Sequence, residues 1–309
     1  MSSLKIGVVG AGHQGRFHAE KYASLMDCKL VAIADIHEKT ANEVARFYDD
    51  AEPYINHKAL LNIVDAVSIA TCAGAHYEIA KDFLQHGKHV LLEKPITSEQ
   101  AEAKHLIELA EECGVILQIG HVERFNPAVI ALNERMDDLK FIEAQRFSPF
   151  RPRGTDVSVV LDLMIHDIDL ILSLVNSNIR HIDSSGMQVL SDGVDIANAR
   201  IIFENGCIAN VTASRVSNKS ERKLRLFQAN AYLSCDLGNR SLKAYTLQDG
   251  EIKPDKLLCG NQDALLAQVS DFVRCIQSGA TPLVSGTDGL RALKTAHQIS
   301  NTMRIHTSK

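Results

Sequence analysis

The sequence predicts an α/β fold with two domains: a doubly wound parallel sheet, then an α/β domain with an open, mostly antiparallel sheet. A glycine-rich turn joins the first strand to the first helix, and strands alternate with helices up to about residue 120. After Pro127, long alternating strands with hairpin-like breaks dominate. A chain of 309 residues can bury two cores, and we expect the domains to span residues 1–121 and 122–309.

The first strand, helix and second strand carry a dinucleotide fingerprint. The apolar run 6–9 precedes G-A-G-H-Q-G at residues 10–15, which reads G-x-G-x-x-G, and a helix is expected over 17–25. The second apolar run, 30–34, ends at Asp35, twenty residues after Gly15. In this context the pattern predicts a Rossmann domain that binds a dinucleotide at a helix N-terminus. Contacts to it are expected from Gly10, Gly12, His13, Gln14 and Gly15.

The acidic residue at the end of the second strand bears on the choice of cofactor. Asp35 is placed to accept hydrogen bonds from the adenosine ribose hydroxyls and to repel a 2′-phosphate. NAD is therefore expected rather than NADP.

The remaining elements follow from periodicity and caps. Gly87 and Gly114 stand where helix C-caps belong, and Ser98 stands where an N-cap belongs. The last helix is expected to pack back on the first domain, and one face of the second sheet is expected to meet a partner subunit. Strands are expected at 64–70, 89–92, 115–119, 140–147 and within 181–247, and helices at 76–85, 98–113, 128–136, 159–175, 263–277 and 288–303.

Composition narrows the class of protein. The chain is 45% apolar and 23% charged with a net charge of -5, which argues against a nucleic-acid partner. No apolar run approaches the roughly 20 residues that span a bilayer, so no membrane partner is expected. The seven cysteines form no C-x-x-C pattern. We expect a cytoplasmic protein without a metal.

Charged and polar residues follow the strand ends that should face the ligand crevice. Lys94, in Glu93-Lys94-Pro95, is a candidate donor to a substrate oxygen, although a solvated lysine at a strand end explains it equally well. His76 and His121 are candidates for cofactor contact or for simple rim residues. Thr71, in the turn before His76, and Lys94 are also candidates for cofactor contact.

A second constellation lies in the apolar segment 159–175. Asp162 and His166 are spaced i, i+4, which places both side chains on one face of a helix. A histidine oriented by a carboxylate is typical of a general base. A helix-stabilising pair and a metal site remain alternatives, but the metal site needs a third ligand from elsewhere.

Arginine is concentrated after residue 121, and its planar fork suits phosphate or carboxylate ligands. Arg151 and Arg153 flank Pro152 in an expected loop and are candidates for binding an anionic ligand. For any single arginine, a solvent-exposed position on the surface of a β domain is the simpler explanation.

The glycine motif, E-K-P at 93–95, R-F-N-P at 124–127 and D-x-x-x-H at 162–166 together resemble the Gfo/Idh/MocA family of sugar and cyclitol dehydrogenases. The resemblance covers nearly the whole chain and implies a homodimer or homotetramer with NAD. It implies catalytic roles for Lys94, Asp162 and His166. One departure is Thr71-Cys72, where the family usually has Thr-Pro.

The segments 120–127 and 148–156 are similar to the nucleotide-sugar 3-dehydrogenases of this family. That similarity implies oxidation at C3 of a substrate such as UDP-N-acetylglucosamine, ahead of an aminotransferase in lipid A or surface-polysaccharide synthesis. A dehydrogenase of a free sugar or inositol, and a catalytically silent NAD-binding regulator, remain alternatives. The substrate contacts implied are Lys94, Arg124, Phe125, Asn126, Arg151, Arg153, Asp162 and His166, with Glu93 beside the cofactor.

Overall fold

The computed structural model describes residues 3–150, 157–229, 231–248 and 250–306. The chain divides into two compact units, residues 1–122 with 263–290 and residues 123–262 with 291–309. The expected boundary after residue 121 lies one residue away, but residues 263–290 return to the first unit, which the simple two-part division did not anticipate.

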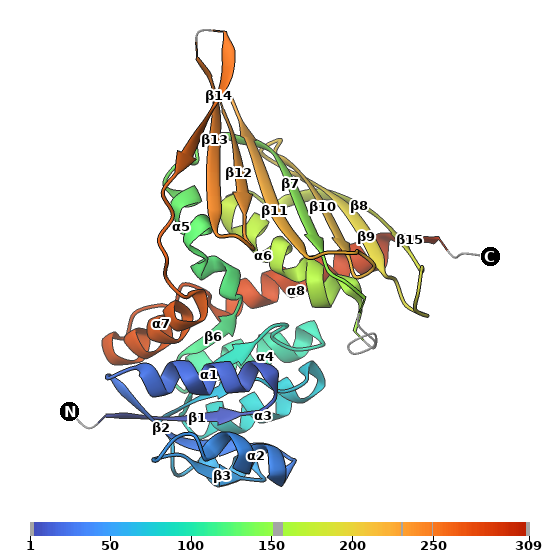
Figure 1. The fold of residues 1–309 in the computed structure, drawn as a ribbon. Coiled ribbons are helices and arrows are strands. Elements are labelled where there is room, and N and C mark those ends of the chain that lie inside the picture. The colour runs from blue at the N-terminus through green and yellow to red at the C-terminus, as the bar shows by residue number, and fades with distance from the viewer. Residues whose placement is uncertain (1–2, 151–156, 230, 249, 307–309) are drawn as a thin grey trace. The chain divides into compact units, whose positions relative to one another are not determined.

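The first unit is a six-stranded parallel sheet with helices (Figure 1). The strand order is β3-β2-β1-β4-β5-β6, and β4 is buried along its whole length, as expected for a parallel strand covered on both faces. Its strands are β1 (Leu4–Val9), β2 (Cys28–Ala34), β3 (Glu52–Tyr54), β4 (Ala66–Ile69), β5 (His89–Glu93) and β6 (Leu117–Gly120). Its helices are α1 (His13–Ser24), α2 (Glu38–Ala45), α3 (Ala73–Gln85), α4 (Gln100–Glu112) and α7 (Ala264–Ser278).

Several element boundaries differ from the sequence-based expectation. Helix α1 starts at His13 directly after the glycine turn, and α3 starts at Ala73, three residues earlier than expected. Glu99, and not Ser98, occupies the N-cap position of α4. Helix α2 and strand β3 were not expected; β3 is a short edge strand that contains Pro53, which weakens its sequence signal.

The second unit is built on a nine-stranded sheet in the order β14-β13-β12-β11-β7-β10-β9-β8-β15. Among the described strands, the neighbours β7 and β10, and likewise β8 and β15, are parallel, and the other neighbours are antiparallel. The strands are β7 (Leu139–Phe147), β8 (Ile179–Met187), β9 (Ile196–Phe203), β10 (Ile208–Ser214), β11 (Glu221–Gln228), β12 (Ala231–Asp236), β13 (Ser241–Gln248), β14 (Glu251–Leu257) and β15 (Met303–His306).

Helices α5 (Pro127–Asn133), α6 (Ile165–Leu174) and α8 (Gly286–Thr302) pack on this sheet through one apolar cluster (Figure 1). Ala292, Ala296 and Ile299 of α8 belong to that cluster. The start of α8, up to Leu290, belongs to the first unit, where Gly289 lies against Ile119, so the expectation that the last helix packs back on the first domain fits the start of α8 and not its later turns. None of the helices in the described ranges combines the length and apolar character needed to cross a membrane.

The segment expected as one helix over 159–175 is interrupted. Residues Val160–Met164 form a π-helical turn, and α6 continues from Ile165. A π-helical turn is wider than an α-helical one and is frequent at functional sites. Asp162 lies in this turn and His166 at the start of α6, so the pair stands where the backbone is irregular.

Candidate active site

A cavity of about 620 Å³ lies in the first unit at the carboxyl ends of β1, β2 and β4. This is the place where open parallel sheets bind ligands. Its walls are mostly apolar, and the exposed side chains of Ile36 and Ile55 stand among them. Lining residues include Gly10, Gly12, Asp35, Ile36, Ile55, Thr71 and Cys72.

The glycine turn has three glycines with three different constraints. Gly10 has a φ of +89°, and a methyl group there would meet the carbonyl oxygen of Ala70 at 2.6 Å. A methyl group on Gly15 would overlap the carbonyl oxygen of Gly10. Gly12 differs, since no atom lies within 4 Å of a Cβ placed there. The turn therefore requires glycine at two positions for its own packing and leaves open space at the third.

The start of α1 offers an anion-binding group. Gly12 occupies the N-cap and has no side chain to satisfy the first N–H groups of the helix, and His13 and Gln14 are exposed in its first turn. Free N–H groups and the positive end of the helix dipole favour a phosphate at this position.

Asp35 closes the cavity at the end of β2. Its Oδ2 accepts a hydrogen bond from the Ala11 N–H at 2.8 Å, and its Oδ1 accepts one from the His37 N–H at 2.9 Å. Each carboxylate oxygen keeps a second lone pair, so Asp35 retains acceptors for hydroxyl groups. The open space at Gly12, the uncapped helix and Asp35 fit a dinucleotide cofactor.

The Glu93-Lys94-Pro95 turn follows β5, and the Lys94–Pro95 peptide bond is cis. Glu93 is buried, and its Oε1 accepts a hydrogen bond from His18 Nε2 at 3.0 Å. Burial raises the pKa of the Glu93 carboxyl, but the hydrogen bond from His18 and the charge of His18 lower this pKa by more. The pKa of Glu93 therefore lies below its usual range. Lys94 is half-buried beside this ionised carboxylate.

The histidines at the strand ends differ from the expected rim residues. His76 is 1% exposed, with Nδ1 at 2.8 Å from the Pro95 carbonyl and Nε2 at 3.2 Å from the Thr71 carbonyl. Because α3 begins at Ala73, His76 lies on the buried helix face instead of at the rim. Both ring nitrogens of His76 therefore face backbone carbonyls, and its contact with the cofactor stays a prediction. His121, after β6, is likewise 1% exposed.

Asp162 and His166 are both half-buried in the second unit. The π-helical turn that contains Asp162 leads directly into the helix that starts before His166. The two side chains remain four residues apart on adjoining turns, although the wider turn changes the angle between them from the expected α-helical one.

The R-F-N segment at 124–126 makes several contacts within the second unit, and its expected contacts with substrate stay a prediction. Arg124 donates to both oxygens of the buried Asp169, from Nε at 2.7 Å and from Nη2 at 2.8 Å. Phe125 is buried. The Asn126 side chain caps α5 by accepting from the Ala128 N–H. Such long-range pairings had no local sequence signal.

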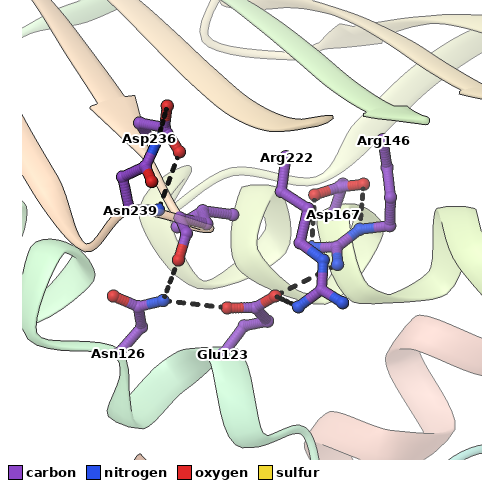
Figure 2. Close-up of polar contacts among 8 residues, drawn as sticks. Glu123, Asn126, Arg146, Asp167, Arg222, Asp236 and Asn239 are labelled. Atoms are coloured by element: carbon purple, nitrogen blue, oxygen red, sulfur yellow. Dashed lines mark hydrogen bonds and ion pairs between the residues drawn. The ribbon is translucent and has the colours of Figure 1, made fainter. Parts of the chain in front are cut away.

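A buried polar network that sequence reasoning missed supports this segment (Figure 2). Arg146 donates to both oxygens of Asp167 at 2.9 and 3.0 Å and to Glu123 at 3.0 Å. Figure 2 shows Glu123 between Asn126 and the two arginines, Arg146 and Arg222. Arg222 Nη1 lies 3.6 Å from Glu123 Oε1. Because each buried charge has an opposite partner, removal of one would leave another unpaired.

Arg151 and Arg153, the expected anion-binding pair, lie outside the described residues. His18 is the residue near the E-K-P turn that was missed. Its signal was present, because Gly15, His18, Ala19 and Tyr22 form one buried face of α1 with a polar residue in its centre.

Comparison with known proteins connects both units to one family. Residues 4–121 match the oxidoreductase family with an NAD-binding Rossmann fold, and residues 136–234 match the GFO/IDH/MocA C-terminal domain. The chain is 36% identical to UDP-N-acetylglucosamine 3-dehydrogenase of Acidithiobacillus ferrooxidans over 97% of both chains. A solved structure of that enzyme matches with a TM-score of 0.92 over 98% of both chains.

More distant relatives have other substrates in their names. The chain is 25% identical to myo-inositol 2-dehydrogenase of Thermotoga maritima over 94% of this chain and 93% of that protein. It is 26% identical to scyllo-inositol 2-dehydrogenase of Bacillus subtilis over 97% of this chain and 94% of that one. With both domains matched and a relative above 30% identity along its length, this chain belongs to the Gfo/Idh/MocA family of oxidoreductases.

Proposed function

We propose that this protein oxidises the C3 hydroxyl of UDP-N-acetylglucosamine to a 3-keto sugar, with NAD as hydride acceptor. The observation that carries the proposal is the 36% identity, along the whole chain, to the A. ferrooxidans enzyme of that name. The 3-keto sugar would be the substrate of an aminotransferase that supplies lipid A or surface polysaccharide. We also propose that the protein acts in the cytoplasm.

NAD is proposed over NADP because of Asp35. Its carboxylate keeps lone pairs for the two ribose hydroxyls and would meet a 2′-phosphate as a like charge. Lys39 is 90% exposed in its side chain and lies 3.9 Å from Glu43, so it offers the 2′-phosphate little fixed compensation.

Three side chains are proposed to act on the substrate hydroxyl. His166 accepts its proton, Asp162 orients that imidazole, and the Lys94 ammonium donates to the oxygen as negative charge develops there. NAD, when bound, would supply the acceptor for the hydride of the sugar carbon. Because the charge on oxygen is largest in the transition state, the lysine contact contributes mainly to kcat.

For the substrate diphosphate we retain Arg151 and Arg153 as proposed partners. Replacement of either by Ala should raise KM for UDP-N-acetylglucosamine more than it lowers kcat, as expected for lost uniform binding. An unchanged KM in both variants would contradict a role of Arg151 and Arg153 in diphosphate binding.

A homodimer or homotetramer is proposed through the second sheet. Four aromatic rings lie side by side on the face opposite the core, with centroids 4.3–5.9 Å apart, and all are only partly buried. They are Phe141, Phe227, Tyr232 and Tyr245, one from each of four neighbouring strands. Light scattering should give a dimer or tetramer for the wild type and a smaller species for Phe227→Lys; a wild-type monomer would contradict the proposal.

The function is tested by NADH formation at 340 nm with a matched substrate panel. UDP-N-acetylglucosamine, UDP-glucose, free N-acetylglucosamine and myo-inositol are compared at equal concentration. The proposal predicts that UDP-N-acetylglucosamine has the highest kcat/KM and that free N-acetylglucosamine is poor. Preference for myo-inositol would instead favour the cyclitol activity named for the more distant relatives.

A further inference from the structure

Two buried histidines bond to the residues that precede and follow Lys94 in the chain. His18, from α1, bonds to the Glu93 side chain. His76, from α3, bonds to the Pro95 carbonyl. We propose that His18 and His76 are positioning residues that together fix the backbone at Lys94 and so aim its ammonium group. This inference rests on the proposed catalytic role of Lys94.

The contact from His18 is a fixed one because both partners are enclosed. His18 is 0% exposed, and its Nδ1 lies 2.7 Å from the hydroxyl of the equally buried Ser68. An ionised carboxylate only accepts hydrogen bonds, so Nε2 must carry the proton that is shared with Glu93. The serine hydroxyl can serve Nδ1 as donor or acceptor, which completes a chain from β4 through α1 to the end of β5.

The Glu93 carboxylate is also confined by β6. A Cβ placed on Gly120 would lie 2.7 Å from Glu93 Oε1, so the carboxylate packs directly against the backbone of β6. With the hydrogen bond from His18 and the backbone of Gly120 both at this carboxylate, the side chain of Glu93 has little freedom. The residue that precedes Lys94 is therefore held by two other elements.

The contact from His76 fixes the residue after Lys94. Burial lowers the pKa of His76, and the two carbonyl groups offset this only in part, so the ring is neutral near pH 7. A neutral ring can donate to only one of its two carbonyl partners, and the shorter distance, 2.8 Å to Pro95 against 3.2 Å to Thr71, favours Nδ1 as the donor. The same ring also packs against the Thr71 loop, which lines the cofactor cavity.

This arrangement matters because a lysine side chain is long and flexible. Its ammonium can be placed only if the main chain at its Cα is fixed. A displacement of about 1 Å at a reacting group can cost about 10²-fold in rate. Buried polar groups also cost stability unless they are fully bonded. Two such groups placed next to one catalytic lysine point to a role in positioning.

Paired amide variants test the proposal, because Asn places a nitrogen near the position of Nδ1 and Gln near that of Nε2. His76→Asn keeps the donor to Pro95 and His76→Gln loses it. For His18 the order is reversed: His18→Gln keeps the donor to Glu93 and His18→Asn loses it. We expect kcat to fall about 10²-fold in His76→Gln and His18→Asn and only a few-fold in their partners.

Two controls separate positioning from general damage. Thermal unfolding and NAD affinity, by calorimetry, should be similar within each pair. If the loss of kcat is proportional to the loss of Tm across all four variants, the proposal is wrong. Equal losses of kcat in the two variants of each pair would also overturn it. Should the His18 variants not fold, Ser68→Ala loosens the same histidine more gently and is expected to lower kcat several-fold at an unchanged Tm; a wild-type kcat would count against the role of His18.

A measurement without substrate distinguishes this proposal from the proposed function. The protein's lysines are reductively ¹³C-methylated, and the Lys94 signal is assigned by its loss in Lys94→Arg. The signal should move in His76→Gln and His18→Asn but stay near the wild-type position in His76→Asn and His18→Gln. A wild type that oxidises no sugar would defeat the proposed function alone, whereas identical Lys94 spectra in all variants would defeat the positioning role alone.

Discussion

A methyl group added at Gly12 or at Gly15 should have opposite consequences, although both positions belong to one motif. Gly15→Ala overlaps the Gly10 carbonyl oxygen, and the overlap is with backbone, which cannot rotate away. Overpacking costs about 1–3 kcal/mol in ordinary cores, and we expect the upper end or more here. A loss of about 3 kcal/mol corresponds to a fall in Tm of roughly 6–12 °C.

Gly12→Ala meets no atom within 4 Å, and the extended backbone of Gly12, with a φ of -70°, lies outside the left-handed region that favours glycine. The apo protein should therefore keep its Tm or gain about 0.4–1 kcal/mol from the stiffer unfolded chain. The methyl group would occupy the space through which a pyrophosphate approaches the backbone, so NAD affinity should fall at least about tenfold, or about 1.4 kcal/mol. Calorimetry with NAD and thermal unfolding of the apo protein measure both effects. Wild-type NAD affinity in Gly12→Ala, or a wild-type Tm in Gly15→Ala, would refute the reasoning.

Three further predictions follow from single side chains. Asp35→Asn should raise the NADP-to-NAD ratio of kcat/KM about tenfold, since a like-charge contact of about 1–2 kcal/mol is removed; an unchanged ratio would count against the NAD assignment. Lys94→Ala and His166→Asn should each lower kcat about 10²–10⁴-fold and retain NAD binding, which stopped-flow hydride transfer and calorimetry would check. Burial raises the pKa of Asp195, but the Ser191 hydroxyl and three backbone N–H groups outweigh it and bring the pKa to about 2, below its ordinary 3.8. This contributes about 2 kcal/mol above pH 4 that disappears as pH falls towards 2, so in urea unfolding Asp195→Asn should cost that amount at pH 7 and almost none at pH 2.

The Rossmann unit could be predicted because its sequence signals are local. The glycine turn, Asp35 and the C-caps at Gly87 and Gly114 each follow from a backbone requirement; both C-cap glycines have positive φ. Strand β14 was missed for the opposite reason, since a charged segment with Pro254 reads as loop and forms a strand only by pairing at the sheet edge.

The contacts that the candidate site residues make within the protein could not be predicted from the sequence. His76 was expected at the rim because its helix was expected to begin there; with α3 starting at Ala73, it shares a buried face with Ile79, Ala80 and Phe83. Arg124 was expected to contact substrate, and its partner Asp169 is 45 residues away on another helix. Such pairings depend on tertiary packing, which no local pattern encodes. The π-helical turn also has no recognisable sequence signal, because its apolar residues fit an α-helix equally well.

The central claim, oxidation of the nucleotide sugar at C3, is tested most directly with UDP-N-acetylglucosamine that carries deuterium at C3. Mass spectrometry of the reduced cofactor shows whether that atom is the one transferred, and single-turnover kinetics show whether its transfer is slowed. The account predicts deuterated NADH in wild-type turnover with a primary isotope effect on hydride transfer. Unlabelled NADH, with the deuterium retained in a sugar product oxidised at another carbon, would contradict it.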